Sequence, residues 1–296
     1  MAKKKFYRPI LYYLLITVKT LFSFLPYRLG FWFGGTLGKL SFRLLSKERK
    51  KTLTHLNYAF GDSKSHAELQ KIGLAMFENY GRMAAELALY KKLVANIDEF
   101  VTIEGREHLD QALSRGDGVI GIVSHFGNWE YLGGTLALKG YKGSVIARRI
   151  YYEKYDKMLV SIRNRFGEKT IYRDRSAKEI LKTLRQNHIL GFVVDQDVEN
   201  IDGVFVNFFG KPAFTPSAPV RLSLASGAPL LPLFILRQGM KHRIFIEPAM
   251  ELTETGDKEK DIITNTQKWV TIQEKWIRQY PEQWVWNHKR WKTQPI

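Results

Sequence analysis

The sequence predicts an α/β fold with a mostly parallel central sheet flanked by helices, preceded by a hydrophobic and basic N-terminal helical segment. Short apolar runs alternate with helical segments over most of the chain. This alternation is typical of parallel strands that helices cover on both faces. The first 45 residues differ, because they combine apolar and basic residues. No internal repeat or linker-like composition divides the remainder, so we predict two parts, 1–45 and 46–296.

The N-terminal segment has the composition of a membrane-associated helix. It opens with "MAKKK", and Lys19 is the one charged residue between Pro9 and Tyr27. A spanning helix needs about 20 apolar residues, and Lys19 and Pro26 interrupt this one. Aromatic and basic residues that suit a membrane interface are interspersed: Arg8, Tyr12, Tyr13, Phe22, Phe24, Arg28, Trp32, Phe33, Lys39 and Arg43. We expect membrane association, through either a spanning or an interfacial helix; a buried helix pair is the alternative.

After residue 45, the sequence predicts two helical stretches, followed by strands that mostly alternate with helices. "SKERKKTLTHLNYAFGDS" is a basic helical stretch, and the next stretch, "SKSHAELQKIGLAMFENYGRMAAELALYKKL", keeps apolar positions at helical spacing. Seven apolar runs then predict strands: "FVTIEG", "GVIGIVSH", "GSVIAR", "KTIYR", "ILGFVVDQD", "PLLPLFILR" and "RIFIEPAM". Helices are expected at 106–115, 128–139, 152–166 and 176–186, in "SAPVRLSLASG", and at 258–280.

Composition narrows the classes of function. The chain has 46 Lys and Arg against 29 Asp and Glu, a net charge of +17, which favours polyanionic partners. Because cysteine is absent, disulfides, thiolate catalysis and cysteine-based zinc sites are excluded. The basic residues are spread along the chain without a nucleic-acid-binding signature. We therefore expect no nucleic acid as a partner.

Two histidine–glutamate pairs share a spacing of five residues, His125…Glu130 and His242…Glu247. The second pair lies in an alternating strand, where an odd separation directs the two side chains to opposite faces. The first pair follows a predicted strand, where ligand sites of parallel sheets gather. Gly127 can form the turn that brings the two side chains together. We read His125…Glu130 as the functional pair, with a buried structural histidine as the alternative.

The pair indicates general base chemistry. A histidine has an ordinary pKa near 6.5 and can accept a hydroxyl proton at neutral pH. A carboxylate on its other ring nitrogen fixes the tautomer. The chain has neither a Gly-x-Ser-x-Gly elbow nor a cysteine, which leaves direct attack of a substrate hydroxyl on an activated acyl group. Asp195 and Asp197 are expected to line or anchor the pocket, and we expect neither a metal nor a cofactor.

Four ordered blocks resemble those of the bacterial lipid A biosynthesis acyltransferases, within the wider glycerolipid acyltransferase superfamily. "HFGNWE" is similar to the His-x4-Asp/Glu motif of that family, and "VIARRIYYEKYDKMLVSIRNRFG" to its second block. "DQDVENIDGVFVNFFGKPAFTPSAPVRLSLASGAPLLPLF" resembles its third and fourth blocks, and "YPEQWVWNHKRWK" its C-terminal signature. The resemblance covers essentially the whole chain, so residues 46–296 would be the acyltransferase domain.

This resemblance implies transfer of a fatty acyl chain from a thioester, on acyl carrier protein or coenzyme A, to a hydroxyl of a lipid A precursor. His125 would be the general base and Glu130 its orienting partner. The residues implied to bind substrate are Asn128, Arg148, Arg163, Arg165 and Asp195. The phosphorylated glycolipid acceptor, an acidic carrier protein and the anionic cytoplasmic face of the bacterial inner membrane would all suit the positive charge.

Two alternatives remain at this point. The acceptor could be a lysophospholipid, an aminolipid or another glycolipid, since the catalytic pair would be unchanged. The chain could also be a non-catalytic basic protein that binds membranes.

Overall fold

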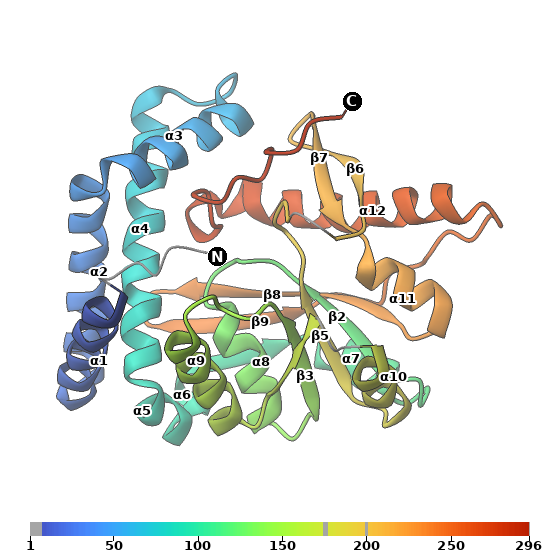
Figure 1. The fold of residues 1–296 in the computed structure, drawn as a ribbon, viewed down its shortest axis with the longest axis horizontal. Coiled ribbons are helices and arrows are strands. Elements are labelled where there is room, and N and C mark those ends of the chain that lie inside the picture. The colour runs from blue at the N-terminus through green and yellow to red at the C-terminus, as the bar shows by residue number, and fades with distance from the viewer. Residues whose placement is uncertain (1–7, 174–176, 199–200, 296) are drawn as a thin grey trace.

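The N-terminal helices form a layer beside the sheet (Figure 1). The computed structural model describes residues 8–173, 177–198 and 201–295, so the "MAKKK" cluster lies outside the described residues. The layer comprises α1 (Arg8–Phe24), α2 (Tyr27–Leu44), α3 (Ser46–Phe60) and α4 (His66–Ala88). The short helices α5 (Tyr90–Ala95) and α6 (Ile97–Phe100) then lead to the sheet. Within the described residues, no helix is both long and apolar enough to cross a membrane.

Glycines allow α2 and α4 to pack at close range. A Cβ atom on Gly38 would lie 2.1 Å from the carbonyl oxygen of Phe77, and one on Gly81 would lie 2.0 Å from that of Gly34. Any larger residue at these positions would force the two backbones apart. The N-terminal segment is therefore packed directly on α4, and the predicted division at residue 45 stays a prediction.

The seven predicted strands form one sheet, in the order β1–β9–β8–β2–β5–β3–β4. Five neighbouring strands are parallel: β8 (Leu230–Gln238), β2 (Val119–Val123), β5 (Ile189–Val193), β3 (Gly143–Ala147) and β4 (Lys169–Tyr172). The exception is β9 (Lys241–Ile246), which is antiparallel to β8 and parallel to β1 (Val101–Glu104). Gly239, with φ of 61°, makes the short turn between β8 and β9. The prediction of a mostly parallel sheet is confirmed.

Helices cover this sheet as the sequence predicts. They are α7 (Arg106–Leu113), α8 (Trp129–Leu138), α9 (Glu153–Phe166), α10 (Ala177–Arg185), α11 (Ala218–Ser226) and α12 (Lys258–Gln279). One apolar cluster includes Tyr131 and Leu132 of α8 with alternate residues of the strands, and another includes Trp269 and Val270 of α12. A hairpin that the sequence analysis missed, β6 (Gly203–Phe208) and β7 (Lys211–Pro216), stands apart from the main sheet (Figure 1).

The C-terminal signature is buried in the body of the protein. Trp284, Trp286 and Trp291 are each at most 8% exposed. Trp286 lies against Phe60 of α3 and Phe209 of the hairpin. Phe126, in the turn after β2, forms an isolated antiparallel bridge with Trp284. These tryptophans therefore connect the N-terminal layer, the hairpin and the turn after His125.

Candidate active site

The carboxyl ends of β2 and β5 bring His125 and Asp195 together. The two strands pair in parallel with Val123 opposite Val193, so the residues two positions further along each chain also meet. The His125 Nδ1 atom lies 2.5 Å from Asp195 Oδ1, and the backbone N–H of His125 donates to Asp195 Oδ2 at 2.7 Å. Side chain and backbone of His125 are thus held by one carboxylate.

Asp195 is ionised and buried, which defines the tautomer of His125. Burial alone would raise the pKa of Asp195. The neighbouring His125, together with hydrogen bonds from His125 and from Trp284 Nε1 at 2.7 Å, outweighs this effect and lowers the pKa. A carboxylate accepts hydrogen bonds only, so Nδ1 carries the proton and Nε2 is the unprotonated nitrogen, which can act as a base. The His125 side chain is 20% exposed, which leaves it accessible to substrate.

Gln196 and His288 complete the surroundings of the His125 ring. The Gln196 amide donates at 3.1 Å to Nε2 of His125 and at 3.1 Å to Nε2 of His288. Burial, and next the nearby His125, lower the pKa of His288 to about 4, so His288 is neutral near pH 7. Sequence reasoning missed both residues. Gln196 directly follows Asp195, but nothing in the order of residues indicates that His288 folds back to this strand end.

Glu130 does not hold the His125 ring, which corrects the predicted pairing. It lies in the first turn of α8 and forms a two-pronged ion pair with Arg163 of α9, at 2.8 and 2.7 Å. The carboxylate that contacts His125 is Asp195. Gly127 makes the turn as expected, with φ of 59°. A Cβ there would lie 1.9 Å from the carbonyl oxygen of Ile235, so the turn runs too close to β8 for any other residue.

The remaining predicted substrate contacts divide into two groups. Arg148 is exposed directly after β3, at the edge where His125 lies, and its role in binding stays a prediction. Arg163 and Arg165 have partners within the protein: Glu130 for the first and the Tyr90 hydroxyl for the second. Asn128 is fully buried and donates to Glu86 Oε2 at 2.7 Å. The amide of Asn128 therefore binds the protein rather than substrate.

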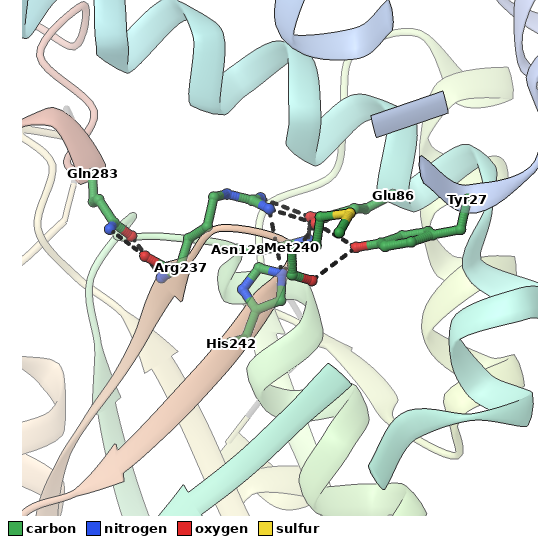
Figure 2. Close-up of polar contacts among 7 residues, drawn as sticks. All are labelled: Tyr27, Glu86, Asn128, Arg237, Met240, His242 and Gln283. Carbon is green, nitrogen blue, oxygen red and sulfur yellow. Dashed lines mark hydrogen bonds and ion pairs between the residues drawn. The ribbon is translucent and has the colours of Figure 1, made fainter. Parts of the chain in front are cut away.

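A buried polar network fixes the turn that follows His125 (Figure 2). Glu86 of α4 is 0% exposed and accepts two hydrogen bonds from Arg237 of β8, at 2.5 and 2.7 Å. The same carboxylate accepts from Asn128 and from the Tyr27 hydroxyl of α2, and contacts His242 of β9 at 3.1 Å. Despite burial, Arg237 and His242 hold the pKa of Glu86 well below its usual range.

His242…Glu247 is not an interacting pair, as the alternation along the strand predicts. His242 faces Glu86, whereas Glu247 accepts a hydrogen bond from the Trp276 indole at 3.0 Å. Asp197 likewise has partners, because its carboxylate accepts from the backbone and hydroxyl of Thr293. In the described part of the chain, no group of three or more histidine, aspartate or glutamate side chains is arranged to hold a metal ion.

An apolar cavity of about 50 Å³ adjoins the site. Val123 and Val193, at the ends of β2 and β5, line it together with Trp129, whose ring lies 4.9 Å from that of His125. Glu168 and Tyr141 are the ionisable side chains on this lining: burial, and next the charge of Glu130, raise the pKa of Glu168 to about 8, and burial also raises the pKa of Tyr141. The cavity is therefore neutral and apolar near pH 7.

The model of the family described as bacterial lipid A biosynthesis acyltransferase matches residues 2–293. The chain belongs to this family. It is an acyltransferase. Among similar curated proteins is the phosphatidylinositol mannoside acyltransferase of Mycobacterium tuberculosis, 27% identical over 70% of this chain and 71% of the relative.

Two relatives from Escherichia coli K12 are aligned over more of the chain. The lipid A biosynthesis myristoyltransferase is 27% identical over 87% of this chain and 79% of its own length. The lipid A biosynthesis palmitoleoyltransferase is 26% identical over 92% and 88%. Membership of this lipid A acyltransferase family confirms the resemblance that the sequence motifs indicate.

Proposed function

We propose that this acyltransferase moves a fatty acyl chain from a thioester to a hydroxyl of a lipid A precursor, with His125 as general base. The observation that carries the proposal is the contact between His125 Nδ1 and the buried Asp195 carboxylate. That contact directs a basic, accessible Nε2 to the edge of the sheet. The family, and the relatives named for lipid A and for phosphatidylinositol mannoside, support a lipid acceptor.

In the proposed reaction, His125 Nε2 accepts the proton of the acceptor hydroxyl while its oxygen attacks the thioester carbonyl carbon. Asp195 stabilises the imidazolium that forms. Collapse of the tetrahedral intermediate breaks the carbon–sulfur bond, and the imidazolium returns its proton to the thiolate. The products are an ester and a free thiol. Because Gln196 donates to the same Nε2, the acceptor hydroxyl takes the place of the Gln196 amide when it binds.

We also propose that the protein acts at the cytoplasmic face of the inner membrane, with α1 and α2 lying in the interface. Large apolar side chains are exposed on both helices: Ile10, Leu14, Leu21, Phe24 and Trp32 are each more than half exposed. Such a face is favourable against lipid and unfavourable in water. The net charge of +17 suits anionic lipid, a phosphorylated acceptor and an acidic carrier protein.

The experiment is mass spectrometry of lipid products after incubation with acyl-loaded carrier protein and a tetra-acyl lipid A precursor. A mass increase of one acyl chain is expected, and loss of the general base in His125→Ala should lower the rate ~10²–10⁴-fold. Near wild-type turnover in His125→Ala would exclude the mechanism. Parallel reactions with acyl-coenzyme A, a phosphatidylinositol mannoside and a lysophospholipid identify the donor and separate the acceptor alternatives.

A further inference from the structure

An open apolar groove of about 510 Å³ lies between the N-terminal helices and the α/β body. Its volume falls within the ~300–1,000 Å³ of typical ligand sites. Small residues of α4, including Gly81, Ala84 and Ala88, face the groove. Val18 of α1, Leu37 of α2 and Leu159 of α9 contribute to its walls. The lining is almost entirely hydrocarbon.

One part of the groove reaches the residues beside the candidate base. Tyr80 and Asn287 line it there, and the Tyr80 hydroxyl donates to the Asn287 side chain at 3.2 Å. The Tyr80 ring lies 6.5 Å from that of Trp129, which in turn lies 4.9 Å from that of His125. An acyl chain bound in the groove can therefore extend to the residues next to His125.

Another part of the groove is continuous with the exposed apolar face of α1 and α2. Leu15, Val18, Leu37 and Leu45 line the groove and are also 38–51% exposed. These side chains therefore belong both to the groove and to the surface that we propose to contact the membrane. The charged lining residues are Lys19 and Glu48, and Glu48 is paired with Lys51.

We propose that this groove binds an acyl chain already carried by the lipid acceptor while its hydroxyl reaches His125. The inference rests on the proposed function. A lipid that presents a hydroxyl to His125 must keep its own chains out of water. The groove offers an apolar route from the membrane-facing helices to that residue. Direct continuity with this face favours an acceptor entering from the bilayer over a donor chain delivered by a soluble carrier.

Ala84 allows the groove to be filled without disturbing the core. It lines the groove and its side chain is exposed, so a larger residue at this position projects into the groove. Ala225, which is exposed on α11 and is not among the groove-lining residues, provides a matched control. The two variants, Ala84→Trp and Ala225→Trp, add the same side chain to an exposed helical position.

The test compares a tetra-acyl lipid A precursor with its deacylated, water-soluble form, each at saturating donor. Ala84→Trp should lower kcat/KM for the acylated acceptor at least ~10-fold, mainly through KM. Turnover of the deacylated acceptor and sedimentation with phosphatidylglycerol vesicles should not change. Ala225→Trp should match the parent protein in all three measurements. Unchanged kinetics in Ala84→Trp, or an equal loss with both acceptors, would overturn the proposal.

Two further arms separate donor from acceptor and binding from catalysis. If the loss in Ala84→Trp grows with the length of the donor chain and not with acylation of the acceptor, the groove binds the donor and the proposal is wrong. The second arm uses a tetra-acyl precursor with a diazirine on one chain, incorporated into vesicles. Photocrosslinks to α4 in the parent protein, reduced in Ala84→Trp, are expected even if no transfer occurs. No transfer by the parent protein would overturn the proposed function instead.

Discussion

The Nδ1 atom of His125 lies 2.5 Å from Oδ1 of Asp195, across two neighbouring parallel strands whose ends are in register. The same carboxylate also accepts the backbone N–H of His125 and the Trp284 indole. Four polar groups from three distant segments therefore fix one ring orientation. In the proposed mechanism, this contact makes Asp195 the orienting partner of His125, in place of Glu130, which the His-x4-Glu spacing suggests.

Replacing Asp195 should impair catalysis more than it impairs folding. In Asp195→Asn, the amide can donate to Nδ1 and favour the wrong tautomer of His125, which leaves Nε2 protonated. We expect kcat to fall ~10²–10⁴-fold, as for loss of the base itself. Steady-state kinetics with saturating donor and circular dichroism of the same samples provide the measurement. A kcat within a factor of about three of the parent would exclude the orienting role.

Glu130→Gln should instead act mainly on stability. The variant leaves the Arg163 guanidinium, 12% exposed, without its carboxylate partner. Losing one partner of such a pair costs about 1–3 kcal/mol of the free energy of unfolding, somewhat less than for a fully buried pair. Urea titrations should show this loss, while the pH dependence of kcat keeps its shape. If Glu130→Gln instead changes the acidic limb of the pH profile of kcat and leaves the free energy of unfolding unchanged, Glu130 takes part in proton transfer.

Much of the fold was predictable because each strand carries its own signal. Seven continuous apolar runs became seven strands, and "SAPVRLSLASG" became α11, ended by Gly227 with φ of 75°. The β6–β7 hairpin was missed because its aromatic residues resemble core or pocket lining. Gly210, which takes a positive φ in the turn after Phe209, is the residue whose type could have indicated this turn.

The site was less predictable because its contacts cross the sheet. His125 is identified by its position at a strand end, and Asp195 lies at the same position after β5. That pairing follows only once β2 and β5 are known to be neighbours, which local sequence does not specify. Glu86 carries still less signal: a glutamate within an amphipathic helix is ordinarily solvated, and only α4 packing against β8 buries it beside Arg237.

The Glu86 network predicts a positioning role for Asn128. Asn128→Ala removes the hydrogen bond that ties the turn after His125 to α4. A small displacement of His125 should lower kcat ~10–10²-fold at nearly constant KM. Tyr27→Phe removes a different hydrogen bond from the same carboxylate and serves as the control. Each of the two variants should lower the free energy of unfolding by ~0.5–1.5 kcal/mol, but Tyr27→Phe should leave kcat unchanged. Parallel losses of kcat in both variants would show a merely structural role.

His288 predicts a pH dependence of stability. Its pKa is about 4 in the folded protein, first because of burial and then because of the nearby His125, against about 6.5 when unfolded. The unfolded chain therefore binds the proton first as pH falls. Stability from His288 is fully present above pH ~6.5 and is lost as pH decreases toward 4. When the pH is lowered from 7.5 to 5, the free energy of unfolding of the parent protein should fall by about 1–2 kcal/mol more than that of His288→Gln, as measured by urea titration. Equal losses would contradict the assignment.

The proposed membrane contact through the exposed face of α1 and α2 leads to a binding prediction. Phe24 is 79% and Trp32 61% exposed, and burying each such side chain contributes about 1.5–3 kcal/mol. The double variant Phe24→Glu/Trp32→Glu should therefore reduce the partition coefficient on phosphatidylglycerol vesicles at least ~10²-fold. Ile263→Glu, at a 45% exposed apolar position on α12, should leave it unchanged. Since basic residues add electrostatic attraction, salt should weaken the binding that remains in the double variant. If the double variant sediments with vesicles as fully as the parent protein does, this face of α1 and α2 does not contact the membrane.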